Sequence, residues 1–294
     1  MAWLSRQGSN GMLFLLGYAI VIASIILGYL GSHGVLIALW QPYEFLIILG
    51  SGLGAHVAGN PWPVHKAIFK LMPQVILGSK ANKAMHMDSL RLIYDILNKS
   101  RKEGMMSIEG DVENPQSSGL FSKYPAIQAN PALADFIADC FRLIAAGNMQ
   151  AHELDSLMDM EIDSRLHELK MPGHAMQTIA DAMPGFGIVA AVLGIVITMG
   201  AIDGPMEELG RHIAAALVGT FSGVLFGYGF FAPISSRMEH IANEEIKLYE
   251  SAKATIVASV NGLPPQLAVE FGRKVLFAHD RPSFAELENV VRSR

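Results

Sequence analysis

The chain has 294 residues, 51% of them hydrophobic, and its 27 acidic and 22 basic residues give a net charge of −5. This balance excludes the strongly basic surface on which nucleic-acid-binding proteins depend. The single cysteine, Cys140, excludes an intrachain disulfide and a cysteine metal cluster, and we expect it to be packed because it lies in an apolar helical stretch.

Charged residues are missing from three long apolar stretches. Met12–Ser32 and Ala182–Ile202 have 21 residues each and Ile213–Ser236 has 24, all without Asp, Glu, Lys or Arg. Phe45–Ala55 is a shorter uncharged stretch. About 20 apolar residues cross a bilayer, and a span in lipid must be helical to bond its backbone groups. The sequence therefore predicts an all-α integral membrane protein with four transmembrane helices; soluble core helices, the alternative, average only about 11–12 residues.

The first two spans form a hairpin around Gly31–Gly34. Glu44 is expected at the outer interface, and His56 near the end of the second span is expected to snorkel or to bond to the helix, with titration as the alternative. The second span is rich in small residues, which favours close packing against another span of this chain or of a neighbour: Gly50, Ser51, Gly52, Gly54 and Ala55.

The long insertion after the second span is predicted to be folded and helical. Ser79–Glu103 shows a helical apolar period and is stopped by Gly104, and a turn-rich stretch, Gly110–Pro125, follows. Asn130 and Pro131 are typical of an N-cap and first helical residue, with Ala132–Ala146 as the helix body and Gly147 as its stop. Ala151–Lys170 is predicted to be an amphipathic helix that Pro172-Gly173 breaks before the third span.

The fourth span has no stop signal, and Met238–Val260 is predicted to continue it until Gly262. A last helix is expected over Gln266–Phe277. Ser283 and Glu286 have the spacing of a capping box that opens a final short helix.

Basic residues set the predicted orientation. Twelve of the 22 lie between Asn60 and Pro172 and eight after Pro233, whereas the connection His33–Gln41 has none. The positive-inside bias then puts both termini in the cytoplasm. The expected division is an N-terminal extension (1–11), a transmembrane hairpin (12–59), a cytoplasmic helical domain (60–183), a second transmembrane hairpin (184–233) and a cytoplasmic helical tail (234–294).

Several stretches together resemble the MotA family, the A subunit of the bacterial flagellar motor stator, within the wider MotA/ExbB/TolQ superfamily. The resemblance covers nearly the whole chain from Met12, and the set is specific although each stretch alone is weak. Its segments are Met12–Tyr18, Lys99–Met105, Ser107–Glu109, Asp111–Pro115, Pro184–Ala191, Val218–Phe221, Ala268–Lys274 and Arg281–Phe284.

The resemblance implies a multi-pass protein of the bacterial inner membrane. In the family, a ring of A subunits, pentameric, surrounds a dimer of MotB, which anchors to peptidoglycan and supplies the ion-carrying aspartate. Ion passage turns the ring, whose cytoplasmic domain pushes the rotor protein FliG. An aspartate supplied by MotB would account for the missing carboxylate at mid-span, where an ion-conducting membrane protein usually needs an ionisable group.

Four residues match family positions with roles in movement. Arg101 and Glu109 match the two rotor-contacting charges; the alternative is a solvated surface. Pro184 and Pro233 match two prolines that couple ion binding to movement of the cytoplasmic domain; the alternative is ordinary helix punctuation. Pro184 lies near the start of a span, where a missing N–H is tolerated, whereas an interior Pro233 would kink its helix.

Thr220 and Ala191 are the predicted ion-pathway residues. Thr220 either bonds back to its own helix or faces the partner's carboxylate, and the resemblance favours the second. Sodium-driven relatives carry a threonine where this chain has Ala191. A hard cation needs oxygen ligands that an alanine methyl lacks, so we expect proton drive.

Other functions have less support. No phosphate loop, nucleophile elbow or metal-ligand spacing is visible, so we expect no enzyme activity, cofactor or metal. An ExbB/TolQ-like channel that energises outer-membrane transport is the first alternative, but that class usually has three spans. A secondary transporter would need polar binding groups at mid-depth, and the spans offer few.

Overall fold

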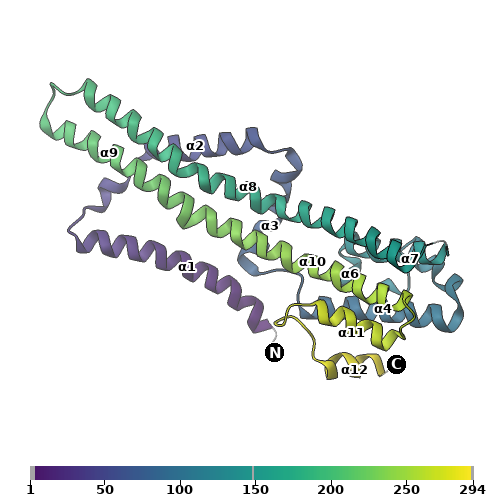
Figure 1. Cartoon of the computed structure of the whole chain (residues 1–294). Helices are drawn as coiled ribbons and strands as arrows, with labels where there is room; N and C mark the ends of the chain where they lie inside the picture. The colour runs from purple at the N-terminus through teal and green to yellow at the C-terminus, as the bar shows by residue number, and fades with distance from the viewer. Residues whose placement is uncertain (1–3, 148, 293–294) are drawn as a thin grey trace. The chain divides into compact units, whose positions relative to one another are not determined.

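The computed structural model describes residues 4–147 and 149–292, which form helices joined by turns (Figure 1). No strand occurs in this described part. Four helical segments are long and apolar enough to cross a membrane: Gly11–Gly31, Leu36–Gly59, and one window in each of Ala151–Gly200 and Met206–Val260. The predicted all-α fold with four membrane helices is confirmed. Residues 1–3 of the expected N-terminal extension lie outside the described residues.

The chain divides into two compact units. Unit 1 comprises Met1–Gly78 and Leu169–Ile241, and unit 2 comprises Ser79–Glu168 and Ala242–Arg294. The membrane boundaries expected at 12–59 and 184–233 stay predictions, because this division follows contacts between residues.

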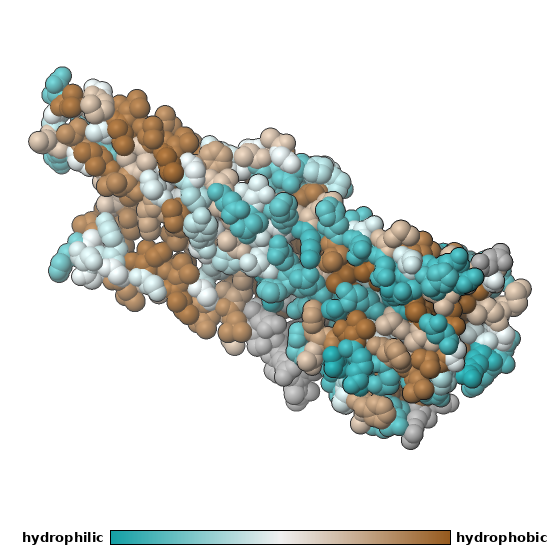
Figure 2. Space-filling model, viewed as in Figure 1, coloured by the Kyte–Doolittle hydropathy of each residue, from teal (hydrophilic) through white to brown (hydrophobic). Residues whose placement is uncertain are grey.

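Unit 1 contains α1 (Leu4–Gly31), the 3₁₀ turn η1 (Leu36–Leu39), α2 (Pro42–Gly59) and α3 (Trp62–Leu77). It also holds the second part of α8 (Ala151–Gly200), α9 (Met206–Val224), the π-helical segment η4 (Leu225–Phe231) and the start of α10 (Ala232–Val260). Helix α3 was not anticipated from the sequence. Hydrophobic residues gather on the surface over α1, α8 and α9 (Figure 2), as lipid contact requires.

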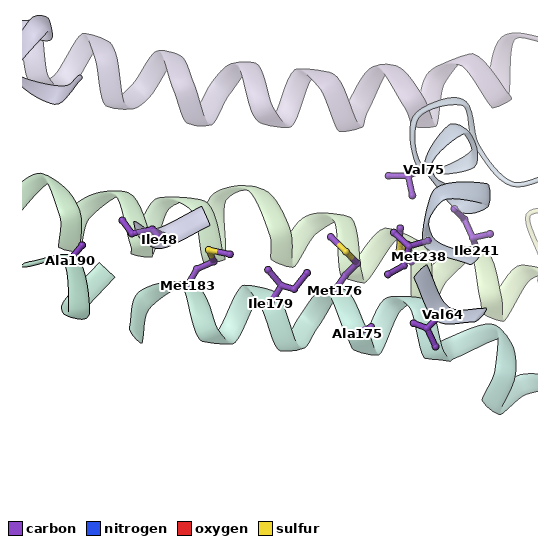
Figure 3. Packing of buried hydrophobic residues seen from close by; sticks show 11 residues of the cluster. Ile48, Val64, Val75, Ala175, Met176, Ile179, Met183, Ala190, Met238 and Ile241 are labelled. Atoms are coloured by element: carbon purple, nitrogen blue, oxygen red, sulfur yellow. The ribbon is translucent and has the colours of Figure 1, made fainter. Parts of the chain in front are cut away.

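The core of unit 1 lies between α2, α3, α8 and α10. Ile48 and Met183 are almost fully buried, and Met238 and Ile241 of α10 pack into the same cluster (Figure 3). Of the small residues in the second span, Gly52 is buried against Met183, whereas Gly50, Gly54 and Ala55 are exposed in the single chain. Most of that small-residue surface is therefore left for other molecules.

The predicted break at Pro172-Gly173 is wrong, because α8 runs unbroken for 50 residues. Pro172 and Pro184 both lie inside this helix, so Pro184 is not near a helix start. An interior proline costs about 3 kcal/mol. At Pro172, contact with α10 supports the helix: the Ser235 hydroxyl donates to the Gly173 carbonyl over 2.8 Å, and Gly173 lies against Glu239.

Unit 2 is built on α4 (Lys83–Glu103), α7 (Pro131–Ala145), α11 (Pro265–Val275), α12 (Phe284–Arg292) and the remaining parts of α8 and α10. Helix α4 begins after Asn82, whose side chain accepts from the Met85 N–H, so it starts four residues later than predicted. The stretch expected to be turns contains four short helical elements, η2 (Met105–Ile108), α5 (Glu109–Glu113), η3 (Phe121–Lys123) and α6 (Pro125–Gln128).

Several local predictions in unit 2 are confirmed. Asn130 caps α7, Gly147 has a φ of 73°, and Cys140 is buried. Helix α10 reaches Val260, as the missing stop signal predicted.

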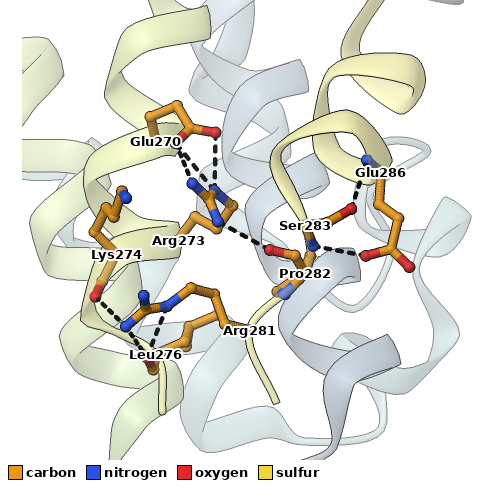
Figure 4. Close-up of polar contacts among 8 residues, drawn as sticks. All are labelled: Glu270, Arg273, Lys274, Leu276, Arg281, Pro282, Ser283 and Glu286. Atoms are coloured by element: carbon orange, nitrogen blue, oxygen red, sulfur yellow. Dashed lines mark hydrogen bonds and ion pairs between the residues drawn. The ribbon is translucent and has the colours of Figure 1, made fainter. Parts of the chain in front are cut away.

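Two arginines organise the C-terminal tail (Figure 4). Buried Arg273 pairs with Glu270 at 2.8 Å and donates to the Pro282 carbonyl at 3.0 Å. Arg281 donates to the Leu276 carbonyl at 2.8 Å. These bonds give the tail motifs of the sequence a structural role, because they hold the turn between α11 and α12.

The capping box is also present. The Glu286 N–H donates to the Ser283 hydroxyl at 3.1 Å, and the Ser283 N–H donates to the Glu286 carboxylate at 2.6 Å (Figure 4). Lys83 donates to the same carboxylate at 2.7 Å. Hydrogen bonds from Lys83 and from Ser283 lower the pKa of Glu286 to about 2.

Helices α8 and α9 meet along a seam of small residues. Small residues recur every three or four positions on both helices, with Ala190 and Ala191 adjacent, which allows the backbones to approach closely. They are Gly187, Ala190, Ala191 and Gly194 on α8, and Ala216, Gly219 and Gly223 on α9. At Gly223, an added methyl group would lie 2.7 Å from both the Gly187 Cα and the Met183 carbonyl oxygen.

We predict that Gly223→Ala lowers the stability of the purified full chain in detergent by about 1–3 kcal/mol, because the added methyl would meet backbone atoms. Thermal unfolding measures the effect. Gly210→Ala is the matched control, since Gly210 is also in α9 but nothing lies within 4 Å of its added methyl. Equal melting temperatures for the two variants would contradict the close packing of α8 against α9 at Gly223.

Candidate functional site

The two predicted ion-pathway residues lie at the same level of the α8–α9 pair. A methyl group added at Gly219, the neighbour of Thr220, would lie 3.3 Å from the Ala191 nitrogen. Thr220 and Ala191 are both half-buried in the single chain. The structure thus places at one level two residues that are 29 positions apart in the sequence.

Thr220 differs from the two other threonines of this helix pair. The Thr178 hydroxyl donates to the His174 carbonyl at 3.1 Å. Thr198 is buried, and its hydroxyl donates to the Gly194 carbonyl at 2.8 Å. The Thr220 hydroxyl has no such bond to any described residue. It is therefore free to bond to a group from outside the chain, although its role stays a prediction.

Pro184 is in contact with the π-helical segment of the fourth span. A proline in a helix leaves the carbonyl four residues earlier without its usual donor, and for Pro184 this is the Ala180 carbonyl. An added methyl at Gly227 in η4 would lie 2.5 Å from the Ala180 oxygen and 3.1 Å from the Pro184 Cδ. The irregular points of the two spans therefore face each other.

Pro233 is the second residue of α10 and is separated from the end of the π-helical segment only by Ala232. A π-helical segment changes the backbone hydrogen-bond pattern, which is one way a helix continues past a proline. Tyr18 of α1 donates to the Phe230 carbonyl at 2.8 Å and stacks on the Phe230 ring. Helix α1 is thus joined to this segment, a contact that the sequence did not indicate.

The predicted rotor-contacting charges lie in unit 2 and are both exposed. Arg101 is in the last turn of α4, and Glu109 is the first residue of α5. Gly104 between them has a φ of 88°, a conformation that favours glycine. Neither side chain forms an ion pair within the described part of the chain, so both charges are available to a partner.

A neighbouring ion pair fixes α5 against α4. Lys99 lies 2.7 Å from Asp111, which also accepts a hydrogen bond of 2.6 Å from Ser118. Partial burial opposes ionisation of Asp111, but the bonds from Lys99 and Ser118 outweigh it and lower the pKa of Asp111. The contribution of this ion pair to stability is therefore present at neutral pH and is lost only as the pH falls through the lowered pKa. No sequence signal indicated this pair, because its members are twelve residues apart.

The described residues contain no group of three His, Cys, Asp or Glu side chains placed to hold a metal ion. The charge-free stretches of the third and fourth spans also offer no titratable carboxylate of their own.

Two family models match the chain. Motility protein A N-terminal matches residues 15–104, and the MotA/TolQ/ExbB proton channel family matches residues 128–251. Motility protein A of Escherichia coli (strain K12) is 44% identical over 282 residues, 96% of each chain. Chemotaxis protein LafT of Vibrio parahaemolyticus is 38% identical over 93% of this chain and 96% of its own.

Two solved structures are similar in fold. A C. jejuni MotAB structure has a TM-score of 0.72 and 18% sequence identity, and covers 92% of this chain and 98% of its own. The flagellar MotAB stator complex from Bacillus subtilis has a TM-score of 0.60, also at 18% identity, and covers 87% of this chain and 92% of its own. With the high identity to motility proteins over nearly the full length, these matches show that the chain belongs to the MotA family.

Proposed function

We infer that this protein is a proton-driven, torque-generating stator subunit of the bacterial flagellar motor and that it forms an ion channel with a MotB partner. The observation that carries this function is the 44% identity to motility protein A over 96% of both chains. The similarity in fold to MotAB stator structures agrees with it. The protein is then a multi-pass protein of the inner membrane.

The finer assembly is part of the same proposal. Five copies form a ring around a MotB dimer that is anchored to peptidoglycan, and the ring drives the rotor protein FliG. Both termini lie in the cytoplasm, because the basic residues are concentrated in the insertion and the tail. The exposed small residues of α2, such as Gly50 and Gly54, support a close contact with another span.

The ion step takes place at the level of Thr220 and Ala191. A proton binds the partner's aspartate there, and the free Thr220 hydroxyl is available to bond to that carboxylate. Ala191 contributes only a methyl group, which leaves a sodium ion without an oxygen ligand. One proton crossing 100 mV releases about 2.3 kcal/mol, which is the energy available for each step.

The movement is proposed to pass through the two proline sites. Neutralising the partner's charge changes the packing of α8 and α9, and the shift is absorbed where Pro184 meets η4 and at Pro233. Helices α8 and α10 both run without a break from unit 1 into unit 2, which supports their role as the connecting elements. Arg101 and Glu109 then deliver the stroke to the rotor.

An ExbB/TolQ-like channel has less support. The family model over residues 128–251 includes that class, but the match to the motility protein N-terminal model over residues 15–104 and the four spans favour the stator. A secondary transporter has even less support, because the third and fourth spans offer few polar groups to bind a solute.

The function is tested by deleting the gene and measuring motility. We expect flagella that are assembled but paralysed, and torque that returns with the cloned gene. Torque in the complemented cell should fall when the proton gradient is collapsed and should not respond to the sodium gradient, because Ala191 lacks a cation ligand. Normal swimming with impaired nutrient uptake would contradict the stator, and torque that follows sodium would contradict proton drive.

Charge reversal tests the rotor contact. Single exposed ion pairs contribute about 0.2–1 kcal/mol, so Arg101→Glu or Glu109→Lys alone should weaken stator–rotor association by up to about fivefold. The double variant Arg101→Glu/Glu109→Lys should reduce torque more than either, as measured by the rotation of tethered cells.

The matched control is Lys123→Glu, which reverses an exposed charge in the same unit. It should leave torque unchanged. Equal losses in the control and the double variant would mean that general surface charge, and not these two residues, supports the contact.

A further inference from the structure

Helix α3 begins where a membrane span ends. The second candidate span ends at Gly59, and α3 begins at Trp62 after only Asn60 and Pro61. The three residue steps from Gly59 to Trp62 reach at most about 11 Å even when fully extended. The N-terminus of α3 therefore lies at the membrane surface wherever the second span ends.

One face of α3 is held in the core of unit 1. Val64, Ile68 and Val75 are buried and belong to the cluster shared with α8 and α10 (Figure 3). At its C-terminal end α3 meets α1: an added methyl at Gly11 would lie 1.9 Å from the Ile76 oxygen. Two contacts therefore hold α3: its buried face packs in the core, and its C-terminal end meets α1.

A histidine pair fixes the rotation of α3 at its N-terminal end. His65 Nδ1 lies 3.2 Å from His56 Nε2, and His65 Nε2 lies 3.1 Å from the Asn60 carbonyl. The Asn60 amide lies 3.2 Å from His56 Nδ1. All four ring nitrogens have a partner when both rings are neutral, with each Nε2 donating and each Nδ1 accepting. The corner between α2 and α3 is thus closed by a complete hydrogen-bond chain.

The opposite face of α3 is exposed and mixes aromatic, aliphatic and basic residues. Trp62 is 70% exposed, Phe69 78% and Leu77 70%. Lys66 and Lys70 are exposed beside them and have no ion pair within the described residues. At about 100° per residue these five positions fall within an arc of about 100°. The helix contains no acidic residue.

This composition matches a membrane surface better than a water-exposed or protein-covered face. Tryptophan is enriched where acyl chains meet headgroups, and lysine stems lie along apolar surface while their ammonium groups reach phosphates. Basic groups near an anionic leaflet each contribute about 1 kcal/mol of attraction. A second copy of the chain would have to supply an acidic, apolar surface at the same depth, and the exposed parts of the spans are uncharged.

We propose that the outward face of α3 is an anionic phospholipid site. Trp62, Phe69 and Leu77 insert between the headgroups and the acyl chains, and Lys66 and Lys70 bind the lipid phosphates. The α2–α3 corner holds this face toward the bilayer. Unit 1 is thereby fixed to one leaflet beside the core that contains α8 and α10.

The test uses the full chain, co-purified with its MotB partner and reconstituted into vesicles, with Trp3→Phe/Trp40→Phe so that Trp62 is the only tryptophan of this chain. The partner's tryptophans are replaced in the same way. Brominated phosphatidylglycerol is added to phosphatidylcholine vesicles. It should quench Trp62 fluorescence at mole fractions far lower than a lipid without preference for the site would need. Lys66→Gln/Lys70→Gln should lower the preference for phosphatidylglycerol by about fivefold per lysine, or about thirtyfold together. The preference should also fall in 1 M salt.

Lys123→Gln/Lys274→Gln removes two exposed charges from unit 2 and should leave the preference unchanged. Brominated phosphatidylcholine alone should quench Trp62 equally in both double variants, which shows that the face still contacts lipid. Absence of quenching by any brominated lipid, with crosslinks from Trp62→Cys to a second copy, would assign the face to a neighbouring subunit and overturn the proposal. An unchanged preference in Lys66→Gln/Lys70→Gln would also overturn it. Quenching needs no ion flow or rotation, so its failure is distinct from failure of the stator function.

Discussion

The structure depends on a close contact between two helices that carry no charge at mid-span. Small residues let α8 and α9 approach until the Gly223 and Gly187 backbones touch, and the same contact puts Ala191 and Thr220 at one level. Packing of this kind needs no water and no ion pair, which suits a bilayer. It also leaves the charge-free stretches of these spans without a carboxylate, and in the proposed function the partner supplies that acid.

Irregular backbone is concentrated where this contact ends. Pro184 frees the Ala180 carbonyl, Gly227 lies directly against it, and the π-helical turn ends just before Pro233. Each irregularity alone would produce a kink. Because the two irregularities face each other, they form one region in which both spans can change their packing together. Beyond it, the Ser235–Gly173 hydrogen bond joins α8 and α10 again.

The sequence predicted the four spans well because absence of charge over about 20 residues is a strong local signal. The caps at Asn130 and Ser283 were equally local and were confirmed. It failed at Pro172, because the support for that helix comes from Ser235, 63 residues later. Helix α3 was missed because its lysines and prolines interrupt the apolar periodicity. Its buried face is defined only by contacts with helices that are distant in the sequence. Arg101 and Glu109 were predicted from the resemblance and stay a prediction, whereas the Lys99–Asp111 pair beside them is visible only in the fold.

Proton conduction by the reconstituted chain, with and without its MotB partner, tests the central claim most directly. Vesicles with a fixed membrane potential and an internal pH dye would report the flux. The account predicts that the full chain alone conducts no better than empty vesicles, and that flux appears with the partner and disappears when the partner's membrane-embedded aspartate is replaced by asparagine. Substantial proton flux through the chain alone would contradict a pathway whose acid comes from a second polypeptide.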